Sequence, residues 1–285
     1  MNFWKMNGAG NDFIIINNIE ENIPAENFKE IAIRLCERHM SIGADGLMIV
    51  EKPDGDADYK MIFYNSDGSL GEMCGNGARC ICRFGFENHL AGKTQRIETT
   101  AGIVTGERIS ERSYKIRLNT PAVCRLDEDV SINNVHLKCS YVELGNPGIP
   151  HCVTEIKNLQ DFPEDMLRDI GRSLRRYSKY PKGANVNFYD IIGDNHIYER
   201  TFERGVEDFT YACGTGTGSV VMVLTLKNLV SGDQVKVDMK GGQLTVDVMT
   251  ESNKVTDIFL TGPTNIVARG EVLDEELKYL INRVY

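Results

Sequence analysis

The feature that most constrains the fold of this chain is an internal repeat centred on two cysteines. Residues 73–80 read MCGNGARC and residues 212–219 read ACGTGTGS. Cys74 and Cys213 therefore stand 139 positions apart, and each directly precedes a Gly-x-Gly sequence. A repeat of this length predicts that one structural unit occurs twice.

The repeat extends on both sides of the cysteines. The paired positions keep their order while their spacing drifts only from 139 to 142: Phe63 with Phe202, Asn65 with Arg204, Gly92 with Gly232, Gly102 with Gly242, Leu118 with Leu260, and Pro121 with Pro263. Few residue types are shared, but the order holds over about 60 positions, which makes chance a poor explanation.

Each copy has the same predicted elements. YKMIFYNSDG and IYERTFERG alternate like strands, and each is followed by the cysteine motif and then by an apolar segment that ends at a glycine. The apolar segments predict helices, with Gly92 and Gly232 at the position just past the helix end. Strands resume after both glycines. The second helix is apolar on nearly every side, which predicts a buried helix, whereas the first is more amphipathic.

These patterns predict an α/β fold with two pseudo-symmetric domains, each with mixed or antiparallel strands wrapped around a central helix. We place the first domain, carrying Cys74, at residues 1–122 and 264–285. The second, carrying Cys213, is expected at residues 123–263.

Composition narrows the possible partners. The 285 residues carry a formal net charge of −9, so no basic stripe is available for a nucleic acid or an anionic membrane, and a small-molecule partner is expected. No apolar run reaches the roughly 20 residues of a membrane span, and residues 1–16 do not read as a signal peptide. We therefore expect a cytoplasmic protein. Its 8 cysteines are irregularly spaced and are expected to be reduced thiols.

A Gly-x-Gly sequence at a helix start suits anion binding and thiol chemistry. The unpaired N–H groups of the first turn and the positive end of the helix dipole can hold a carboxylate or a phosphate. The same field can lower a cysteine pKa from about 8.5 to roughly 3.5–7.5. Two such starts, Cys74 and Cys213, could remove a proton from one face of a carbon and return one to the other. That chemistry is two-base racemisation or epimerisation.

Other interpretations of the cysteines remain open at this point. A single Cys-Gly-x-Gly is commonly a structural turn with a small buried cysteine. Zinc would favour Cys-x2-Cys pairs, whereas Cys74, Cys80 and Cys82 are spaced by six and two residues, so we expect no metal. A redox pair of Cys74 with Cys213 is possible, although neither lies in Cys-x-x-Cys. The helix ends could also belong to a non-catalytic anion-binding protein.

Several motifs, in this order, resemble those of the pyridoxal-independent diaminopimelate epimerase family. They are MNGAGNDF, GADGL, FYNSDGSLGEMCGNGARC, GNPGIPHCV, GANVNF, RTFERGV and ACGTGTGS, and they span the full length of the chain. The resemblance implies two pseudo-symmetric α/β domains, no organic cofactor, a homodimer, and epimerisation of LL-diaminopimelate to the meso form. No Rossmann fingerprint, P-loop or pyridoxal lysine is recognisable either.

The resemblance also implies roles for individual residues. Cys74 and Cys213 would be the two acid/base groups. The backbone around Gly75 and Asn76, and around Gly214 and Thr215, would hold the carboxylate at the reacting carbon. The positions that would bind the amino and distal groups of the substrate are Asn11, Asn65, Asn146, Asn185, Glu203 and Arg204.

Two segments depart from the family pattern. GNPGIPH is two residues longer than the usual GNPH, which affects the reach of Asn146, and the segment between ERGV and ACG is one residue longer. Phe209 and Tyr211 lie in the second of these. Because relatives of this fold racemise other amino acids, the alternative is a racemase of another amino acid, such as histidine, with the same two-cysteine mechanism.

Overall fold

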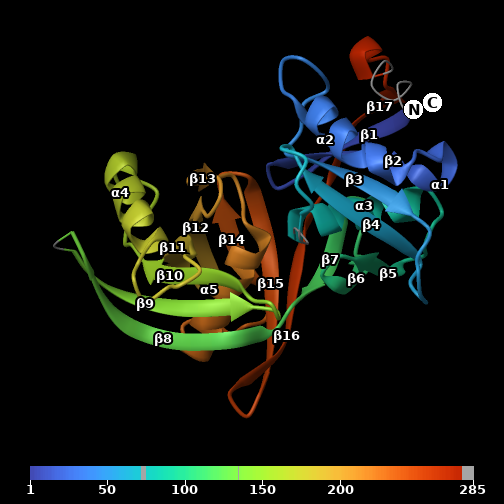
Figure 1. The fold of residues 1–285 in the computed structure, drawn as a ribbon. Helices are drawn as coiled ribbons and strands as arrows, with labels where there is room; N and C mark the ends of the chain where they lie inside the picture. The colour runs from blue at the N-terminus through green and yellow to red at the C-terminus, as the bar shows by residue number, and fades with distance from the viewer. Residues whose placement is uncertain (72–74, 134, 278–285) are drawn as a thin grey trace. The chain divides into compact units, whose positions relative to one another are not determined.

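The computed structural model describes residues 1–71, 75–133 and 135–277, which form a mixed α/β protein made mostly of strands, as Figure 1 shows. The predicted α/β fold class is confirmed. The chain divides into two units, which we call unit 1 and unit 2. Unit 1 contains Met1–Ile116 and the chain from Pro263 onward, and unit 2 contains Arg117–Gly262.

The strands of unit 1 are joined edge to edge in one order. Two neighbouring pairs, β2–β3 and β4–β5, are parallel, and the others are antiparallel. In order across the unit the strands are β17 (Asn265–Glu271), β1 (Asn2–Gly8), β2 (Asn11–Asn17), β3 (Gly46–Glu51), β4 (Tyr59–Asn65), β5 (Thr94–Thr99), β6 (Gly102–Arg108) and β7 (Ser113–Leu118).

Unit 2 repeats this order and the same alternation of directions. Its parallel pairs, β10–β11 and β12–β14, stand at the same places in the series. The strands are β8 (Pro121–Ile132), β9 (Val135–Leu144), β10 (Ile149–Glu155), β11 (Asn185–Gly193), β12 (His196–Glu203), β14 (Val235–Met239), β15 (Gly242–Glu251) and β16 (Lys254–Pro263), with β13 (Asp208–Thr210) added beside β12. The repeat therefore involves strands well outside the segments in which the sequence reveals it.

Each unit has one helix against each side of its strands. α3 (Gly75–Glu87) packs on β1, β2 and β6, and α5 (Gly214–Leu226) packs on β9, β10, β11 and β15. On the other side, α2 (Phe28–Cys36) covers β3 and β4, while α4 (Glu164–Arg175) covers β8, β11 and β12. Two short turns, α1 (Asn18–Glu21) and η1 (Ala25–Asn27), precede α2.

We call α3 and α5 the inner helices. Both end before Gly92 and Gly232, the glycines that the sequence placed just past each helix end. α3 ends at Glu87 and α5 at Leu226, and the left-handed residue that follows each is His89 (φ 58°) or Asn228 (φ 56°). The next residue closes the helix end with a backbone bond, Leu90 N–H to Gly85 O and Leu229 N–H to Leu224 O. These are Schellman motifs, again 139 positions apart. The prediction for Gly92 and Gly232 was wrong because a histidine and an asparagine adopt the left-handed conformation.

β4 of unit 1 corresponds to β12 of unit 2, but their residues match one position away from the alignment that the sequence predicted. Phe63 contacts Phe13 of β2, on the face of the strands that carries α3. Phe202 instead packs against Gly171 of α4, so its counterpart is Tyr64, which contacts Phe28 of α2. Because side chains alternate between the two faces of a strand, Phe63 corresponds to Thr201 and Asn65 to Glu203.

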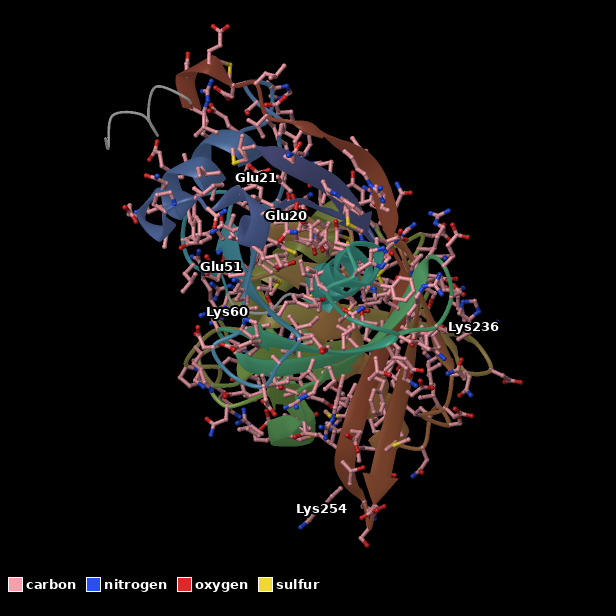
Figure 2. All side chains as sticks on the ribbon, turned by 90° about the vertical axis from the view of Figure 1, so that its right-hand side faces the viewer. Glu20, Glu21, Glu51, Lys60, Lys236 and Lys254 are labelled. Carbon is pink, nitrogen blue, oxygen red and sulfur yellow. The ribbon has the colours of Figure 1, made fainter. Side chains whose placement is uncertain are left out.

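Exposed charged side chains extend into solvent, as Lys236 and Lys254 do in Figure 2. Within the described residues, no helix has both the length and the apolar character needed to cross a membrane. Two clusters of buried apolar side chains belong to the core. One lies between α2 and the strands it covers, and the other lies between α4 and the strands it covers.

Candidate active site

Cys213 caps the start of α5. Its backbone is extended (φ −130°, ψ 104°), and its carbonyl accepts the first helical hydrogen bond from Thr217 N–H at 2.8 Å. The backbone N–H of Gly216 donates to the thiol sulfur, and the Thr215 hydroxyl lies 3.7 Å from it. The sulfur is therefore placed where the unpaired N–H groups of the first turn point.

The second glycine of the motif is required by close packing. A Cβ on Gly216 would lie 2.2 Å from Asn187 Oδ1 and 3.2 Å from Cys213 Sγ. A side chain at this position would push β11 and the thiol away from the helix start. Glycine thus lets the helix sit directly on Asn187 while its N–H faces the sulfur.

Burial changes the expected electrostatics of this thiol. The pKa of Cys213 is raised well above its usual value, first by burial and then by the negative charge of Glu203. The Gly216 N–H and the Thr215 hydroxyl lower the pKa, but they do not outweigh burial. The expectation that the helix start lowers this pKa was therefore wrong for Cys213. Burial therefore favours the thiol form of Cys213.

The other predicted residues of unit 2 lie at strand ends. Asn185 begins β11, accepts a bond from Arg204 N–H at 2.8 Å and donates to Pro150 O at 3.3 Å. Glu203 ends β12, and its charge acts on Cys213. Arg204 follows it, with its guanidinium donating to Lys182 O at 3.1 Å. Asn146 is exposed in the turn between β9 and β10.

In unit 1 the structure brings Asn11 and Asn76 together. Asn76, which is fully buried in the first turn of α3, donates to Asn11 Oδ1 at 2.6 Å and accepts from Arg79 at 2.9 Å. Asn11 in turn donates to Asp45 at 3.1 Å. Gly10 (φ 94°) turns the chain back between β1 and β2, and this tight turn presents Asn11 to the helix start.

The remaining positions of unit 1 are only partly described. Gly75 is the first residue of α3, and Asn65 ends β4, where its side chain donates to the Ser69 hydroxyl at 2.9 Å. Cys74 lies outside the described residues. Its predicted role is carried forward as part of the proposal below.

Sequence reasoning missed a buried polar network beneath α5. Asn187, Thr201 and Glu199 lie on neighbouring strands, and Thr217 reaches down from the helix. His151 contacts Asn187 at 3.2 Å from β10. A signal was present in IYERTF, where Ile197, Glu199 and Thr201 occupy alternate positions, but the alternation alone does not say which face meets α5.

The two aromatic residues near Cys213 are not equivalent. The ring of Phe209 packs between Phe188 and Phe202, with Arg200 4.2 Å from its centroid, so it belongs to the core under α4. Tyr211 is exposed and faces Lys240. Only Tyr211 is therefore available to a ligand.

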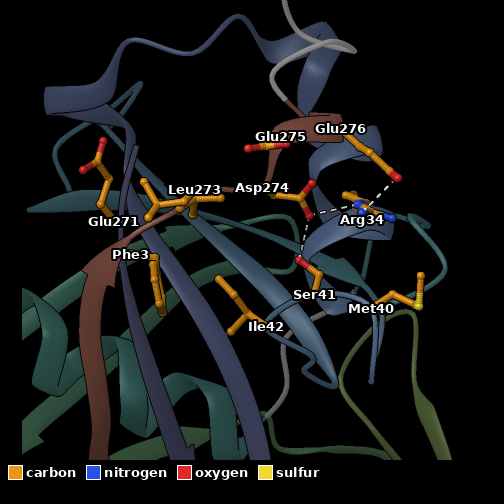
Figure 3. Close-up of a pocket in the computed structure, with 11 residues that line it drawn as sticks. Phe3, Arg34, Met40, Ser41, Ile42, Glu271, Leu273, Asp274, Glu275 and Glu276 are labelled. Carbon is orange, nitrogen blue, oxygen red and sulfur yellow. Dashed lines mark hydrogen bonds and ion pairs between the residues drawn. The ribbon is translucent and has the colours of Figure 1, made fainter.

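A separate hollow in unit 1 contains none of the predicted site residues. Figure 3 shows Arg34 there, bound to Asp274 and Glu276, with Ser41 donating to Asp274. Because Arg34 is already paired with two carboxylates, the described residues that line the hollow offer no unpaired positive charge to an anionic substrate. Among the described residues, no group of three or more histidine, cysteine and acidic side chains could hold a metal ion.

Solved structures show the type of fold that this chain has. A probable proline racemase from Agrobacterium radiobacter K84 matches with a TM-score of 0.68 and 16% identity, covering 99% of this chain and 95% of its own. A phenazine biosynthesis PhzF family protein from Enterococcus faecalis matches with a TM-score of 0.64 and 13% identity, covering 95% of this chain and 98% of its own. The chain thus has the proline racemase and PhzF type of fold, with a cysteine at an inner helix start.

Sequence comparison narrows the class to one family. The diaminopimelate epimerase family model matches residues 3–121 and 144–267. The diaminopimelate epimerase of Aquifex aeolicus (strain VF5) is 36% identical over 291 residues, covering 98% of this chain and all of the relative. The chain belongs to the diaminopimelate epimerase family, and the expected isomerase class is confirmed.

Proposed function

We propose that this protein interconverts LL- and meso-diaminopimelate, with no organic cofactor and no metal, in lysine biosynthesis. The observation that carries the proposal is family membership over nearly the full chain. It is supported by Cys213, which occupies the N-cap of an inner helix with a backbone N–H directed at its sulfur.

In this mechanism Cys74 and Cys213 act on opposite faces of the α-carbon. One thiolate takes the α-proton: an S–H bond forms, the C–H bond breaks, and the electron pair is delocalised into the substrate carboxylate. The other thiol donates its proton to the opposite face of the carbon. In each direction one cysteine would start as the thiolate and the other as the thiol. The reverse reaction starts from the opposite protonation pattern.

The substrate carboxylate would be held by the N–H groups around Gly214 and Thr215 and by those around Gly75 and Asn76. Glu203 would face the substrate ammonium group. An ammonium there would offset the negative charge that raises the pKa of Cys213, so substrate binding would favour proton transfer at this sulfur.

The distal end of the substrate would be bound by Arg204 and by asparagines. The planar guanidinium of Arg204 suits a carboxylate, while amide groups offer both a donor and an acceptor. Asn185 supports this arrangement, because its side chain holds the Arg204 backbone at 2.8 Å. Asn11, Asn65 and Asn146 complete the proposed set of substrate-binding residues.

The proposal also covers the domains, the oligomeric state and the cellular location of the protein. Residues 1–122 with 264–285 would form the first epimerase-like domain and residues 123–263 the second. The protein would act as a homodimer in the cytoplasm. Size-exclusion chromatography with light scattering tests the dimer: a monomer of 32.0 kDa at working concentration contradicts it.

The activity is tested by proton NMR in heavy water with freshly reduced protein. LL-Diaminopimelate and, in a separate sample, L-histidine are followed for loss of the α-proton signal. Exchange on diaminopimelate alone is expected. Exchange only on histidine would make the protein a racemase of another amino acid, and no exchange on either would contradict the proposed reaction.

A further inference from the structure

A buried carboxyl group lies under the helix that carries Cys213. Glu199 of β12 is 2% exposed, and its side chain points to α5. Its Oε2 lies 2.7 Å from the Thr217 hydroxyl, and its Oε1 lies 3.3 Å from the Thr201 hydroxyl. The Thr217 hydroxyl also reaches the carbonyl oxygen of Cys213 at 3.0 Å, so one hydroxyl links the carboxyl to the N-cap.

Counting donors and acceptors identifies the protonation state that fits this network. Two hydroxyls, of Thr201 and Thr217, face four acceptors: both Glu199 oxygens, Asn187 Oδ1 and Cys213 O, the last of which also accepts the Thr217 backbone N–H at 2.8 Å. If Glu199 is ionised, the two hydroxyl protons are shared among these four oxygens. If Glu199 is protonated, it donates to Thr217, and both hydroxyl protons are free for Cys213 O and Asn187 Oδ1. The geometry therefore suits a neutral carboxylic acid.

The charges around Glu199 do not oppose a neutral form. Burial raises the pKa of Glu199 to about 7, and the two threonine hydroxyls only partly offset this. A small hollow is lined by Glu199, Thr201 and Cys213, together with Arg200 and Lys240. Arg200 is bound to Glu164, and Lys240 lies over the ring of Tyr211. The negative form of Glu199 raises the pKa of Cys213.

We propose that Glu199 is a positioning residue for Cys213: as a neutral acid it orients the Thr217 hydroxyl onto the Cys213 carbonyl, and its ionisation disfavours the Cys213 thiolate. The role of Cys213 as an acid/base group rests on the proposed function. The state of Glu199 and its effect on the thiol do not, because both can be measured without substrate.

The first experiment detects the protonated acid directly. Infrared difference spectra between pH 5.5 and 9 are recorded for the wild type, Glu199→Gln and a control, Glu155→Gln, which removes an exposed carboxyl from β10. A carboxylic-acid C=O band that titrates near neutral pH in the wild type and the control, and is absent in Glu199→Gln, is expected. The proposal is overturned if all carboxyl groups titrate below pH 5.5 in the wild type.

The second experiment measures the thiol. Iodoacetamide labelling of the Cys213 peptide is followed by mass spectrometry from pH 6 to 9. Glu199→Gln keeps a neutral donor beside Thr217, so its Cys213 should react up to about tenfold faster than wild type above pH 7.5, which corresponds to one pKa unit, and equally fast at pH 6. Equal rates at every pH would overturn the proposal.

A third experiment uses two variants of Thr217 and distinguishes a positioning role of its hydroxyl from a packing role, even if Glu199→Gln does not fold. Thr217→Ser keeps the linking hydroxyl and Thr217→Val removes it with little change in volume. For the reaction of the full protein, Thr217→Val is expected to lower kcat about tenfold with KM nearly unchanged, while Thr217→Ser stays within about twofold. Equal kcat in both variants contradicts a role for the hydroxyl.

Discussion

The two units share one strand order but place different side chains at five corresponding positions beneath their inner helices. The side chains beneath α3 are apolar at the same positions where those beneath α5 are polar. By strand order and register the corresponding pairs are Phe13 and His151, Met48 and Asn187, Met61 and Glu199, Phe63 and Thr201, and Ala78 and Thr217. All ten residues are buried.

The comparison shows that the shared architecture depends on backbone hydrogen bonds, while the buried side chains can differ between the units. Pairing, helix starts and Schellman ends recur in both units because backbone hydrogen bonds need them whatever the side chains are. A polar interior is tolerated under α5 because its donors and acceptors bind one another. Under α3 the buried polar pair is a different one, Tyr59 and Gln95, which bind each other and the carbonyl oxygens of Ile81 and Cys82.

The largest effect is expected from the two cysteines, which the repeat places at equivalent positions of the two units. Cys74→Ala and Cys213→Ala should each reduce kcat for epimerisation by at least about 10²-fold, because each removes one proton-transfer group. Cys124→Ala, an exposed cysteine of β8, is the control and should stay near wild type. Loss of activity in only one of these two variants would show that Cys74 and Cys213 do not have equivalent roles.

The interior comparison is tested most directly by exchanging one corresponding pair. Met61→Glu places a carboxyl among apolar side chains and should lower the free energy of unfolding by about 3 to 5 kcal/mol near neutral pH. Glu199→Met should change it by within about 1 kcal/mol, since Thr217 and Thr201 keep Cys213 O and Asn187 Oδ1 as acceptors. Urea unfolding measures both. Equal losses would show that the polar network is not what accommodates Glu199.

His151 should make unit 2 sensitive to acid. Burial, aided by the charge of Arg204, lowers the pKa of His151 to about 3, from a usual value of 6.5. The unfolded chain therefore binds a proton first, and stability falls by up to about 4 kcal/mol as the pH drops from 6.5 to 3. His151→Phe, which copies Phe13, should remove this part of the slope in urea unfolding. An unchanged slope would mean that His151 is not held neutral.

A smaller effect is expected at Gly216. Gly216→Ala should cost about 2 kcal/mol of stability and slow the reaction, because its Cβ would meet Asn187 and the Cys213 sulfur. Gly55→Ala, with open space around it, is the matched control. Thermal unfolding and kcat are measured on both variants. A Gly216→Ala protein as stable and active as the control would contradict the close packing beneath the helix start.

The sequence predicted the repeat, the inner helices and the strands around them, because glycine motifs and alternation are local signals. It failed where a tertiary choice decides. The face of β12 that meets α5, and hence the place of Glu199, depends on which side α5 packs. The pKa of Cys213 depends on burial, which the Cys-Gly-x-Gly motif does not encode. The left-handed conformation of His89 could not be predicted either, because the residue at that position is not a glycine.

The two-thiol mechanism is tested most directly by following hydrogen isotopes during the first turnovers. The protein is incubated with LL-diaminopimelate in heavy water, and product and remaining substrate are separated and analysed by mass spectrometry. Because each thiol carries a single exchangeable proton, the product should contain one deuterium at the reacting carbon while the remaining substrate contains almost none. Early product that retains the original proton would mean that one base returns it, and would contradict a mechanism with one cysteine on each face.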